Sequence, residues 1–264
     1  MTTGVPAYTT ESFHEKTSDY CLLIPIINEK GRIEKELARA FQAGVDQCAD
    51  IVICDGGSTD GCTDRDSLTK YHVNTLLVKT DKGKQGAQLR MGFDWALQRN
   101  YRGIITIDGN NKDSIEDVPR FIEKLKEGYD FVQGSRFIKG GRAIRTPLVR
   151  LIAVRLIHAP VISLTAHKHY TDTTNAYRAY SRAYITDSRV DVFRDIFDTY
   201  ELLAYLSVRA DQLKMKTCEI PVTREYPKNE KTPTKIKGIK GNYNLFRILI
   251  RNMMGQYKPK KVRG

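Results

Sequence analysis

The chain has 264 residues, with 43 Lys and Arg against 31 Asp and Glu and a formal net charge of +12. This length is enough for one large domain with a full apolar core, and it favours a single domain over several. The positive charge favours an anionic partner, such as a nucleotide phosphate, an acidic membrane surface or a nucleic acid, without choosing among them. The five cysteines are odd in number and include no C-x-x-C pair, so we expect a reduced cytoplasmic protein without structural zinc.

Neither the N-terminus nor the longest apolar stretch predicts membrane insertion. Residues 1–18 mix Thr, Ser, Glu and Lys without a long apolar segment, which argues against a secretory signal and predicts a loose N-terminal arm. The longest apolar stretch, Leu148–Ala166, is interrupted by Arg150, Arg155 and His158. A spanning helix needs about 20 mainly apolar residues, so we expect no transmembrane helix.

In the first half of the chain, apolar runs typical of strands alternate with helical spacing. This alternation predicts βαβ units and an α/β fold with a mostly parallel twisted sheet and helices on both faces. The expected strands are Tyr20–Ile27, Ile51–Cys54, Val73–Val78, Gly103–Ile107 and Phe131–Gly134, and the expected helices are Ile33–Ala43, Gln85–Arg99 and Asp117–Glu127.

The second half of the chain lacks the regular strand–helix alternation of the first half and predicts a basic C-terminal extension. Residues 19–240 are expected to form the main domain, and residues 241–264 an amphipathic basic helix and tail. The segments in chain order are a helix over Leu148–Leu164, a turn over Thr171–Asn175, a helix near Tyr200–Leu213, a strand over Cys218–Val222, a mobile basic loop over Arg224–Lys240, an amphipathic helix over Tyr243–Met254 and a basic tail over Lys258–Arg263.

Two runs each carry a carboxylate from an apolar strand into a glycine-containing turn. They are Asp50–Gly61, with the sequence DIVICDGGSTDG, and Gly103–Asp113, with GIITIDGNNKD. Because ligands bind where the strands of an open parallel sheet end, we expect Asp55 and Asp108 to lie in one crevice. This arrangement is typical of a site for a nucleotide, with or without a metal ion.

Asp55 precedes two glycines that let a ligand approach the backbone. Its carboxylate can accept hydrogen bonds from a ribose or a base. The alternative is that Asp55 only caps the helix after the turn, a role that Asp60 fits better.

Further motifs follow one another along the chain. In this order they resemble family 2 glycosyltransferases, and within them the dolichyl-phosphate-mannose synthase branch. The resemblance covers roughly residues 20 to 250. The motifs are P-x-x-N-E at Pro25–Glu29, D-G-G-S-T-D-G at Asp55–Gly61, K-x-G-A at Lys84–Ala87, Asp108 to Asn110 in place of D-x-D, G-S-R-F at Gly134–Phe137 with Gly140 and Gly141, and D-T-T-N-A-Y-R at Asp172–Arg178.

The resemblance implies a GT-A-like fold and a site for a nucleoside-diphosphate sugar. In the family the first Asp of the D-G-G-S-T-D-G turn contacts the nucleoside, and the same is implied for Asp55. The implied donor-binding residues are Pro25, Asn28, Glu29, Asp55, Gly57, Lys84 and Asp108.

The resemblance also implies a divalent cation, Mg²⁺ or Mn²⁺, at Asp108. A hard cation held by carboxylate oxygens stabilises a departing diphosphate as a Lewis acid. Asn110 stands where the family usually has a second carboxylate; its amide oxygen can ligate a metal without adding charge, so weaker metal binding is expected. Asp113 either helps to hold the metal or caps the next helix.

The second set of motifs implies an acceptor site for a phosphate group. Arg136 and Arg150 match basic residues near the acceptor phosphate in the synthase branch, and an arginine fork makes two charge-assisted hydrogen bonds to a phosphate. Ordinary surface charge is the alternative for both, and local Asx and Ser/Thr turns are the alternative for the Thr171–Asn175 region. The implied acceptor residues are Arg136, Arg150, Thr174, Asn175 and Arg178, and the implied catalytic residues are Asp108, Arg136 and Asp172.

We therefore expect an inverting glycosyltransferase that moves a sugar from a nucleoside-diphosphate sugar to a polyprenyl-phosphate-type acceptor, as a peripheral protein on an anionic membrane surface at the cytoplasmic face. The first alternative is transfer to a saccharide hydroxyl of a growing glycan, and another is a catalytically silent relative. A basic nucleic-acid-binding protein is a third, but no helix-turn-helix, RNP or zinc-finger pattern appears, so no nucleic-acid partner is expected.

Overall fold

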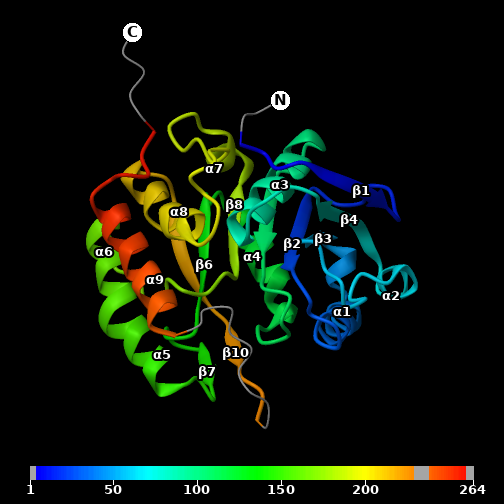
Figure 1. The fold of residues 1–264 in the computed structure, drawn as a ribbon, viewed down its shortest axis with the longest axis horizontal. Coiled ribbons are helices and arrows are strands. Elements are labelled where there is room, and N and C mark those ends of the chain that lie inside the picture. The colour runs from blue at the N-terminus through cyan, green and yellow to red at the C-terminus, as the bar shows by residue number, and fades with distance from the viewer. Residues whose placement is uncertain (1–3, 229–237, 260–264) are drawn as a thin grey trace.

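The computed structural model describes residues 4–228 and 238–259, and its centre is an eight-stranded mixed sheet flanked by helices (Figure 1). The strand order is β1-β4-β3-β2-β5-β8-β6-β9. Four neighbouring pairs are parallel, and β1-β4, β5-β8 and β8-β6 are antiparallel. The strands are β1 Tyr8–Ser12, β2 Tyr20–Ile26, β3 Asp50–Asp55, β4 Val73–Lys79, β5 Gly103–Thr106, β6 Phe131–Ser135, β8 Arg178–Ser181 and β9 Thr217–Pro221.

Helices cover both faces of the sheet, as predicted, and each face has its own apolar core. One core contains side chains of α3, α6, α8 and α9. The other contains side chains of α1, α2 and α4. The α-helices are α1 Ile33–Gln42, α2 Arg65–Lys70, α3 Gln85–Gln98, α4 Val118–Lys126, α5 Leu148–Ala153, α6 Ala159–Ala166, α7 Arg182–Thr186, α8 Glu201–Gln212 and α9 Gly238–Met253.

The helices form where apolar residues recur on one side and where their ends are satisfied. In α1, Ile33, Leu37 and Ala40 recur at the three- to four-residue spacing of one helix face and are fully buried. In α2, the Asp64 carboxylate accepts the Ser67 N–H at 3.1 Å and caps the first turn. Pro119 lies in the first turn of α4, where its missing N–H removes no helical bond.

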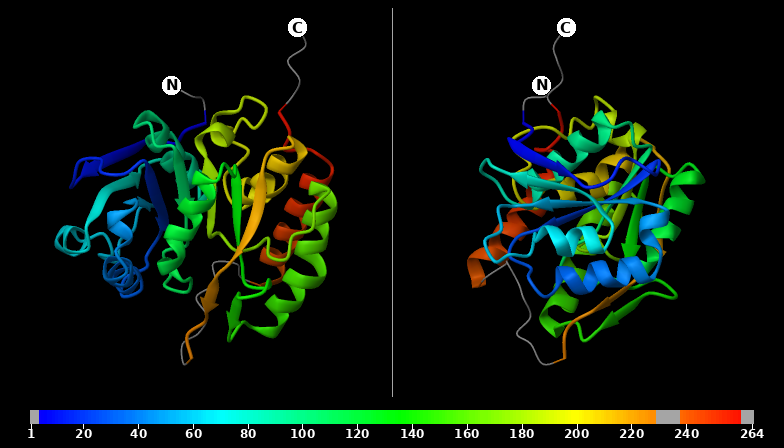
Figure 2. Two further views of the ribbon diagram at one scale, coloured as in Figure 1. Left: turned by 180° about the vertical axis from the view of Figure 1, so that it is seen from behind. Right: turned by 90° about the vertical axis from the view of Figure 1, so that its right-hand side faces the viewer.

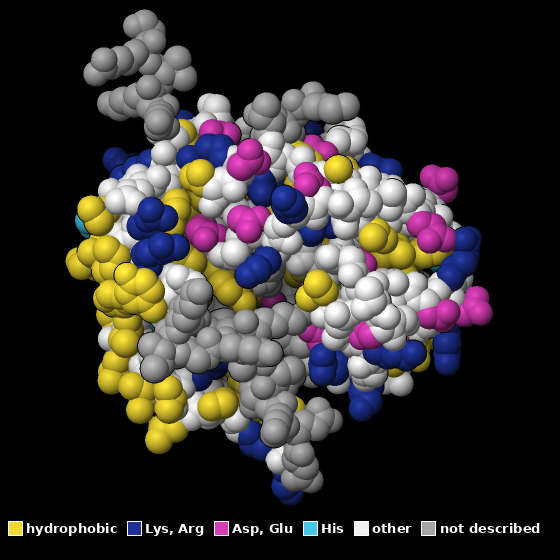
Figure 3. All heavy atoms as spheres, viewed as in Figure 1, with side chains coloured by type: hydrophobic (Ala, Val, Ile, Leu, Met, Phe, Trp, Pro, Cys, Tyr) yellow, Lys and Arg dark blue, Asp and Glu magenta, His cyan; other side chains and the backbone are white. Residues whose placement is uncertain are grey.

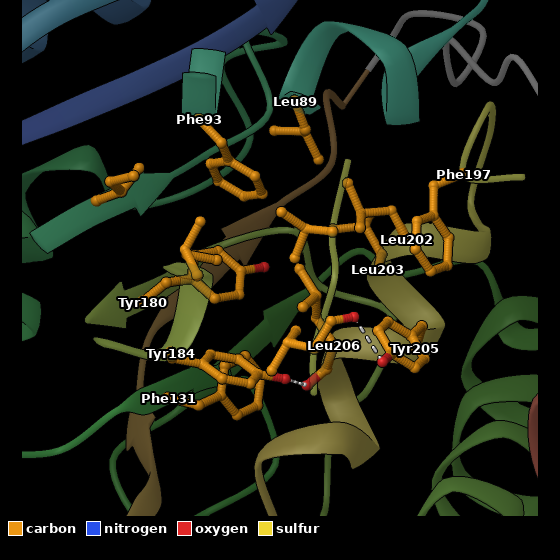
Figure 4. Close-up of a cluster of buried hydrophobic side chains, with 14 of the residues drawn as sticks. Leu89, Phe93, Phe131, Tyr180, Tyr184, Phe197, Leu202, Leu203, Tyr205 and Leu206 are labelled. Atoms are coloured by element: carbon orange, nitrogen blue, oxygen red, sulfur yellow. Dashed lines mark hydrogen bonds between the residues drawn. The ribbon is translucent and has the colours of Figure 1, made fainter. Parts of the chain in front are cut away.

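The core beneath α8 is rich in aromatic side chains (Figure 4). Phe131 of β6 and Tyr180 of β8 pack with their ring centroids 5.6 Å apart. Tyr184 at α7 adds a third ring and donates its hydroxyl hydrogen to the Leu206 carbonyl at 2.8 Å. Burying large rings while satisfying their hydroxyls fixes α8 against the sheet.

The predicted elements of both halves are present, with ends shifted by a few residues. Residues 8–12 differ, because they form strand β1 along the edge of β4 instead of lying in a loose arm. Part of the expected basic loop is also ordered: β10 (Thr223–Glu225) pairs with β7 (Arg142–Ile144) in a small parallel sheet. The loop residues 229–237 and the tail residues 260–264 lie outside the described residues.

Leu148–Ala166 forms one continuous helix of α5, a π-helical stretch over Val154–His158, and α6. By length and composition it could cross a membrane, so the expectation that its basic residues rule this out is wrong on those two criteria. It packs beside α8 and α9 (Figure 2). Only 22% of the candidate span is buried. Its large apolar side chains form an exposed face at one side of the molecule (Figure 3).

Candidate active site

The carboxyl ends of three neighbouring strands meet at one edge of the sheet. In the register, Ile26 of β2 lies opposite Asp55 of β3, and Leu23 of β2 lies opposite Thr106 of β5. Asp55 and Asp108 therefore follow strands on either side of β2, at the edge where open parallel sheets bind ligands.

Asp55 is buried and organises the turn that follows it. Its carboxylate accepts the Gly57 and Ser58 N–H groups at 3.1 and 2.9 Å and the Ser58 hydroxyl at 2.5 Å. Gly57 has φ of +92°, a conformation that side chains other than glycine rarely adopt. Asn28 joins this turn to β2, because its amide oxygen accepts the Thr59 N–H at 2.9 Å. The observed contacts of Asp55 thus lie within its own turn.

The remaining predicted donor residues lie around the same edge. Pro25 stands in β2 opposite Cys54 of β3. Glu29 is buried and accepts a hydrogen bond from Arg32 at 2.5 Å. Lys84 is exposed at the residue before α3, and its N–H donates to the Asp198 carbonyl at 3.2 Å. Gln85, the first residue of α3, donates a hydrogen bond from its side-chain amide to Asp108, so the positive N-terminal end of α3 lies at this edge.

Asp108 lies just beyond β5, and both of its carboxylate oxygens are already engaged. Oδ1 accepts the Gln85 side-chain amide at 2.9 Å, and Oδ2 lies 3.3 Å from Arg224 Nη2. The next residue must be small, since a Cβ on Gly109 would lie 2.4 Å from Ile26 Cγ2. Glycine thus allows the turn to pack directly against β2.

The side-chain oxygen of Asn110 is an unsatisfied hydrogen-bond acceptor. Its Oδ1 is buried and has no hydrogen-bond partner. A buried acceptor of this kind normally has a donor or a cation beside it. The described residues contain no cluster of three or more His, Cys, Asp or Glu side chains that could hold a metal. Asp108 and Asn110 nevertheless fit a hard divalent cation that completes its shell with water or ligand oxygens.

Three buried charged residues, Asp113, Arg224 and Glu36, lie beside the Asp108 turn. Asp113 is fully buried and pairs with Arg224 of β10. Burial raises the pKa of Asp113 to about 6, although the positive charge of Arg224 acts to lower it. Glu36 of α1 is also fully buried and accepts the Asn111 N–H at 2.7 Å, which holds the turn after Asp108. The sequence predicts either a metal-holding or a helix-capping role for Asp113, places Arg224 at the start of a mobile loop and gives no role to Glu36.

Arg136 and Asp172 form a buried bidentate ion pair. Arg136 follows β6, and its Nε and Nη2 donate to the two Asp172 oxygens at 2.6 and 2.9 Å. Nη2 also donates to the exposed Thr174 hydroxyl at 3.0 Å. The third nitrogen, Nη1, makes no hydrogen bond to another described side chain or backbone group, so it remains available to a ligand.

The turn before β8 is held from beneath by Arg178 and Glu219. Arg178 is buried, and its three nitrogens donate to the carbonyls of Thr173, Asn175 and Leu203 at 2.7 to 3.0 Å. Glu219 of β9 accepts the Asp172 N–H at 3.1 Å. The structure therefore places Arg178 as a positioning residue, with its guanidinium committed to the backbone rather than open to an acceptor. Asn175 is buried and accepts the Tyr177 N–H.

Arg150 connects α5 to the Asp108 region through Tyr226. Its Nη1 donates to the Tyr226 hydroxyl at 2.8 Å, and Arg224 and Lys112 lie over the same ring. Burial alone would raise the pKa of Tyr226, but Arg224 and Arg150 outweigh it and lower the pKa. A cavity of about 490 Å³ opens next to this cluster, and most of its charged lining is basic. The lining residues are Arg32, Lys35, Arg39, Asn110, Asn111, Lys112, Ser114, Arg145, Thr223, Glu225 and Pro227.

Comparisons with known proteins agree with this geometry. The chain is 25% identical over 235 residues to the polyprenol monophosphomannose synthase of Mycolicibacterium smegmatis, covering 86% of this chain and 84% of that one. It is 29% identical over 211 residues to the undecaprenyl-phosphate mannosyltransferase of Micrococcus luteus, covering 76% and 81%.

A solved structure has the same fold. Glucosyl-3-phosphoglycerate synthase from Mycobacterium tuberculosis, in complex with Mn²⁺, uridine diphosphate and phosphoglyceric acid, superposes with a TM-score of 0.64 at 17% identity, over 92% of this chain and 80% of that one. The predicted GT-A fold is confirmed. The family model for glycosyl transferase family 2 matches residues 21–198. The chain belongs to glycosyl transferase family 2 and is a glycosyltransferase.

Proposed function

We propose that this protein transfers a sugar from a nucleoside-diphosphate sugar to a polyprenyl-phosphate-type lipid, with inversion, at the cytoplasmic face of a membrane. The main observation behind the proposal is that the candidate donor site at Asp108 and the candidate acceptor residue Arg150 lie at the same edge of the sheet. The Asp108 turn and the Arg150 helix are joined there by Arg224 and Tyr226. The names of two relatives, for polyprenol and undecaprenyl phosphates, support the acceptor class.

The donor is proposed to lie across the ends of β2, β3 and β5. Lys84 and the N-terminal end of α3 face its diphosphate, and the Asp55 turn supports the nucleoside. Asp108 and the free oxygen of Asn110 would hold Mg²⁺ or Mn²⁺. When bound, the cation supplies Lewis-acid stabilisation of the leaving diphosphate. The other donor residues proposed are Pro25, Asn28, Glu29 and Gly57.

The acceptor phosphate is proposed to bind Arg136 and Arg150, with Thr174 and Asn175 beside it. One of its oxygens attacks the anomeric carbon, the bond to the diphosphate breaks, and the nucleoside diphosphate leaves with the electron pair. A phosphate monoester has a second pKa of roughly 6, so the attacking oxygen is already largely ionised and needs no general base. Asp172 then serves to hold the Arg136 fork in place.

The location of Arg150 supports a lipid acceptor at a membrane surface. Arg150 lies on the same helix as Leu148 and Val149, whose side chains are 69% and 79% exposed. Phe246 of the neighbouring α9 is also exposed. A phosphate held by Arg150 would thus lie beside an apolar face that can enter the headgroup region, and the net charge of +12 favours anionic lipid.

The test begins with a thermal-shift screen of UDP-, GDP- and dTDP-sugars with Mg²⁺ or Mn²⁺ on the full chain. A ligand that binds only the folded state raises the midpoint of unfolding. The donor found in this way is then assayed for transfer to a short polyprenyl phosphate and to a neutral saccharide. We expect transfer only to the lipid phosphate, and a loss on the order of 100-fold for Asp108→Asn. Asp19→Asn, at the opposite edge of the sheet, is the matched control.

Three results would contradict the proposal. Turnover with the neutral saccharide alone would assign the enzyme to a growing glycan. Tight, salt-sensitive binding of duplex DNA without any response to nucleotide sugars would favour a nucleic-acid-binding protein. No transfer from any donor would indicate a catalytically silent member of the family.

A further inference from the structure

Arg224 is placed beside the candidate metal site by a network of backbone hydrogen bonds. Its strand β10 lies against the segment that follows Asp108: the Glu225 N–H donates to the Lys112 carbonyl at 2.7 Å, and the Thr223 carbonyl accepts the Ser114 N–H at 2.9 Å. Asp113 and Arg224 also form an isolated antiparallel bridge. The position of the Arg224 guanidinium is therefore fixed by the paired backbone of β10, and Arg224 is not a mobile surface side chain.

The two terminal nitrogens of Arg224 are divided between two carboxylates. Nη1 pairs with Asp113, which is fully buried, and Nη2 lies 3.3 Å from Oδ2 of Asp108, whose side chain is 23% exposed. The contacts of Arg224 with these two carboxylates differ in how much it costs to break them. Releasing the buried Asp113 would leave an uncompensated charge in the interior, which is strongly destabilising. Releasing Asp108 exposes it only to solvent or to a ligand, so the outer contact is the weaker one.

Other buried arginines near the site are arranged differently. Arg178 donates to three backbone carbonyls, and Arg136 pairs with the single carboxylate of Asp172. Arg224 instead places a permanent positive charge on the carboxylate that a divalent cation would need. Because residue 110 is an asparagine, Asp108 is the single carboxylate of the D-x-N turn, and one guanidinium can neutralise it.

We propose that Arg224 is a tethered counter-ion that competes with the divalent cation for Asp108. It stays anchored on Asp113 while its outer nitrogen releases Asp108. This inference rests on the proposed function, in which Asp108 and Asn110 hold the cation. Cation alone binds weakly, because it must displace a positive charge and then lie near it. A nucleoside diphosphate brings negative charge that both the cation and the displaced guanidinium can face, so the two ligands strengthen each other's binding.

The test measures Mn²⁺ binding by calorimetry, without sugar transfer, in the wild type and in Arg224→Leu combined with Asp113→Asn. The second substitution avoids a bare buried carboxylate. We expect Mn²⁺ alone to bind the double variant about tenfold more tightly, and UDP or GDP to strengthen Mn²⁺ binding less than in the wild type. Arg189→Leu with Asp187→Asn, an ion pair beyond α7, removes the same charges and should leave Mn²⁺ affinity unchanged.

A second variant covers the case in which the double variant does not fold. Arg224→Lys keeps a positive charge for Asp113 but has no second terminal nitrogen in the place of the Nη2 that lies 3.3 Å from Asp108, so Mn²⁺ affinity should again rise. Equal or weaker Mn²⁺ binding in the folded variants would overturn the inference, since Arg224 would then be neutral toward the metal or help to hold it. Failure of the proposed function would give a different result. The Arg224 variants would still bind Mn²⁺ more tightly than the wild type, but no sugar would be transferred to a lipid phosphate.

Discussion

At the scale of single residues, the site is built on carboxyl groups that the fold takes out of water. Glu36 and Asp113 are fully buried behind the Asp108 turn, and Glu219 is half-buried under Asp172. Burial raises the pKa of all three. Desolvating carboxylates opposes folding at neutral pH, so the site is organised at the expense of stability.

Glu36→Gln should make the protein more stable at high pH. Burial raises the pKa of Glu36 well above its usual value, so its contribution to stability is complete below the unfolded-state pKa and is lost as pH rises through the folded-state pKa. Glutamine keeps an oxygen for the Asn111 N–H and carries no charge. The thermal midpoint should therefore fall less between about pH 5 and about pH 8 in the variant than in the wild type. Glu123→Gln, on the exposed side of α4, should follow the wild type, and parallel curves for Glu36→Gln would contradict the prediction.

The sequence predicted the residues of the site that lie within motifs, and not those that arrive from elsewhere. Asp55 and Asp108 could be placed because each directly follows an apolar strand. Arg136 and Asp172 were each implied as catalytic residues by motif order, but their ion pair was not predicted. Arg224 carried no signal, because it lies more than 100 residues beyond Asp108 in a basic segment that looks like any solvated loop. Its place depends on backbone pairing between β10 and the segment after Asp108, which local pattern does not encode.

At the scale of elements, the helix of Leu148–Ala166 has two sides with different partners. One side packs on α8 and α9, and Ile162 and Ala166 are buried there. The other side exposes Leu148, Leu156 and Leu164, which no described segment covers. An apolar patch of this kind marks an interaction surface more often than it marks ordinary surface. The α9 helix shows the same division, with Ile248 and Leu249 buried and Phe246 exposed, so its packing on the domain is compatible with the proposed membrane contact.

The proposed membrane surface predicts that acidic substitutions on this helix weaken binding to vesicles. Leu156→Glu with Leu164→Glu should lower the partition of the full chain onto anionic liposomes by at least about tenfold, because each buried leucine contributes roughly 1.5–3 kcal/mol. Co-sedimentation at low and high salt measures this. Ile196→Glu, an exposed apolar residue outside the helix, is the control. Truncating α9 is a poorer test, since Ile248 and Leu249 belong to the core. Equal binding of all three proteins would exclude this surface.

Strand and helix patterns predicted the alternating first half well, and they failed where an element is short or depends on distant partners. β8 has four residues and is antiparallel between β5 and β6, so neither its length nor its neighbours could be read from its own sequence. β1 was missed because its sequence, YTTES, has no alternation of apolar and polar residues. It is a strand because it pairs with β4. The boundaries of α1, α3, α4 and α8 were predicted to within one residue from their apolar spacing, although none of these helices has a side-chain N-cap hydrogen bond.

At the scale of the whole molecule, the two apolar cores share one sheet. Leu22, Ile51 and Ile53 face one core, while Leu23 and Val52 of the same strands face the other. Alternate residues of a strand point to opposite faces, so loss of β2 or β3 would expose both cores at once. The molecule therefore has no internal boundary at which half of it could unfold alone.

We expect equilibrium unfolding in urea to be a single cooperative transition. Trp95 is the one tryptophan of the chain, is buried in the α3 core and stacks on Tyr101 with ring centroids 5.6 Å apart. Its fluorescence reports that core, while far-ultraviolet circular dichroism reports all helices. The two midpoints should coincide. A fluorescence transition clearly separate from the dichroism transition would show that the two faces unfold independently.

The position of β8 has a consequence for how the chain is made. Strands β2, β3, β4 and β5 emerge from the ribosome within the first 106 residues, but the partner of β5 on its other side, β8, spans Arg178–Ser181. Until that segment has been synthesised, β5 presents an open edge, and β6 lacks the neighbour that joins it to the sheet. Open strand edges pair readily with other chains. A nascent chain of this protein thus passes through a long interval in which its central strand is an aggregation hazard, and release from that hazard comes with the segment that also completes the Asp172 side of the active site.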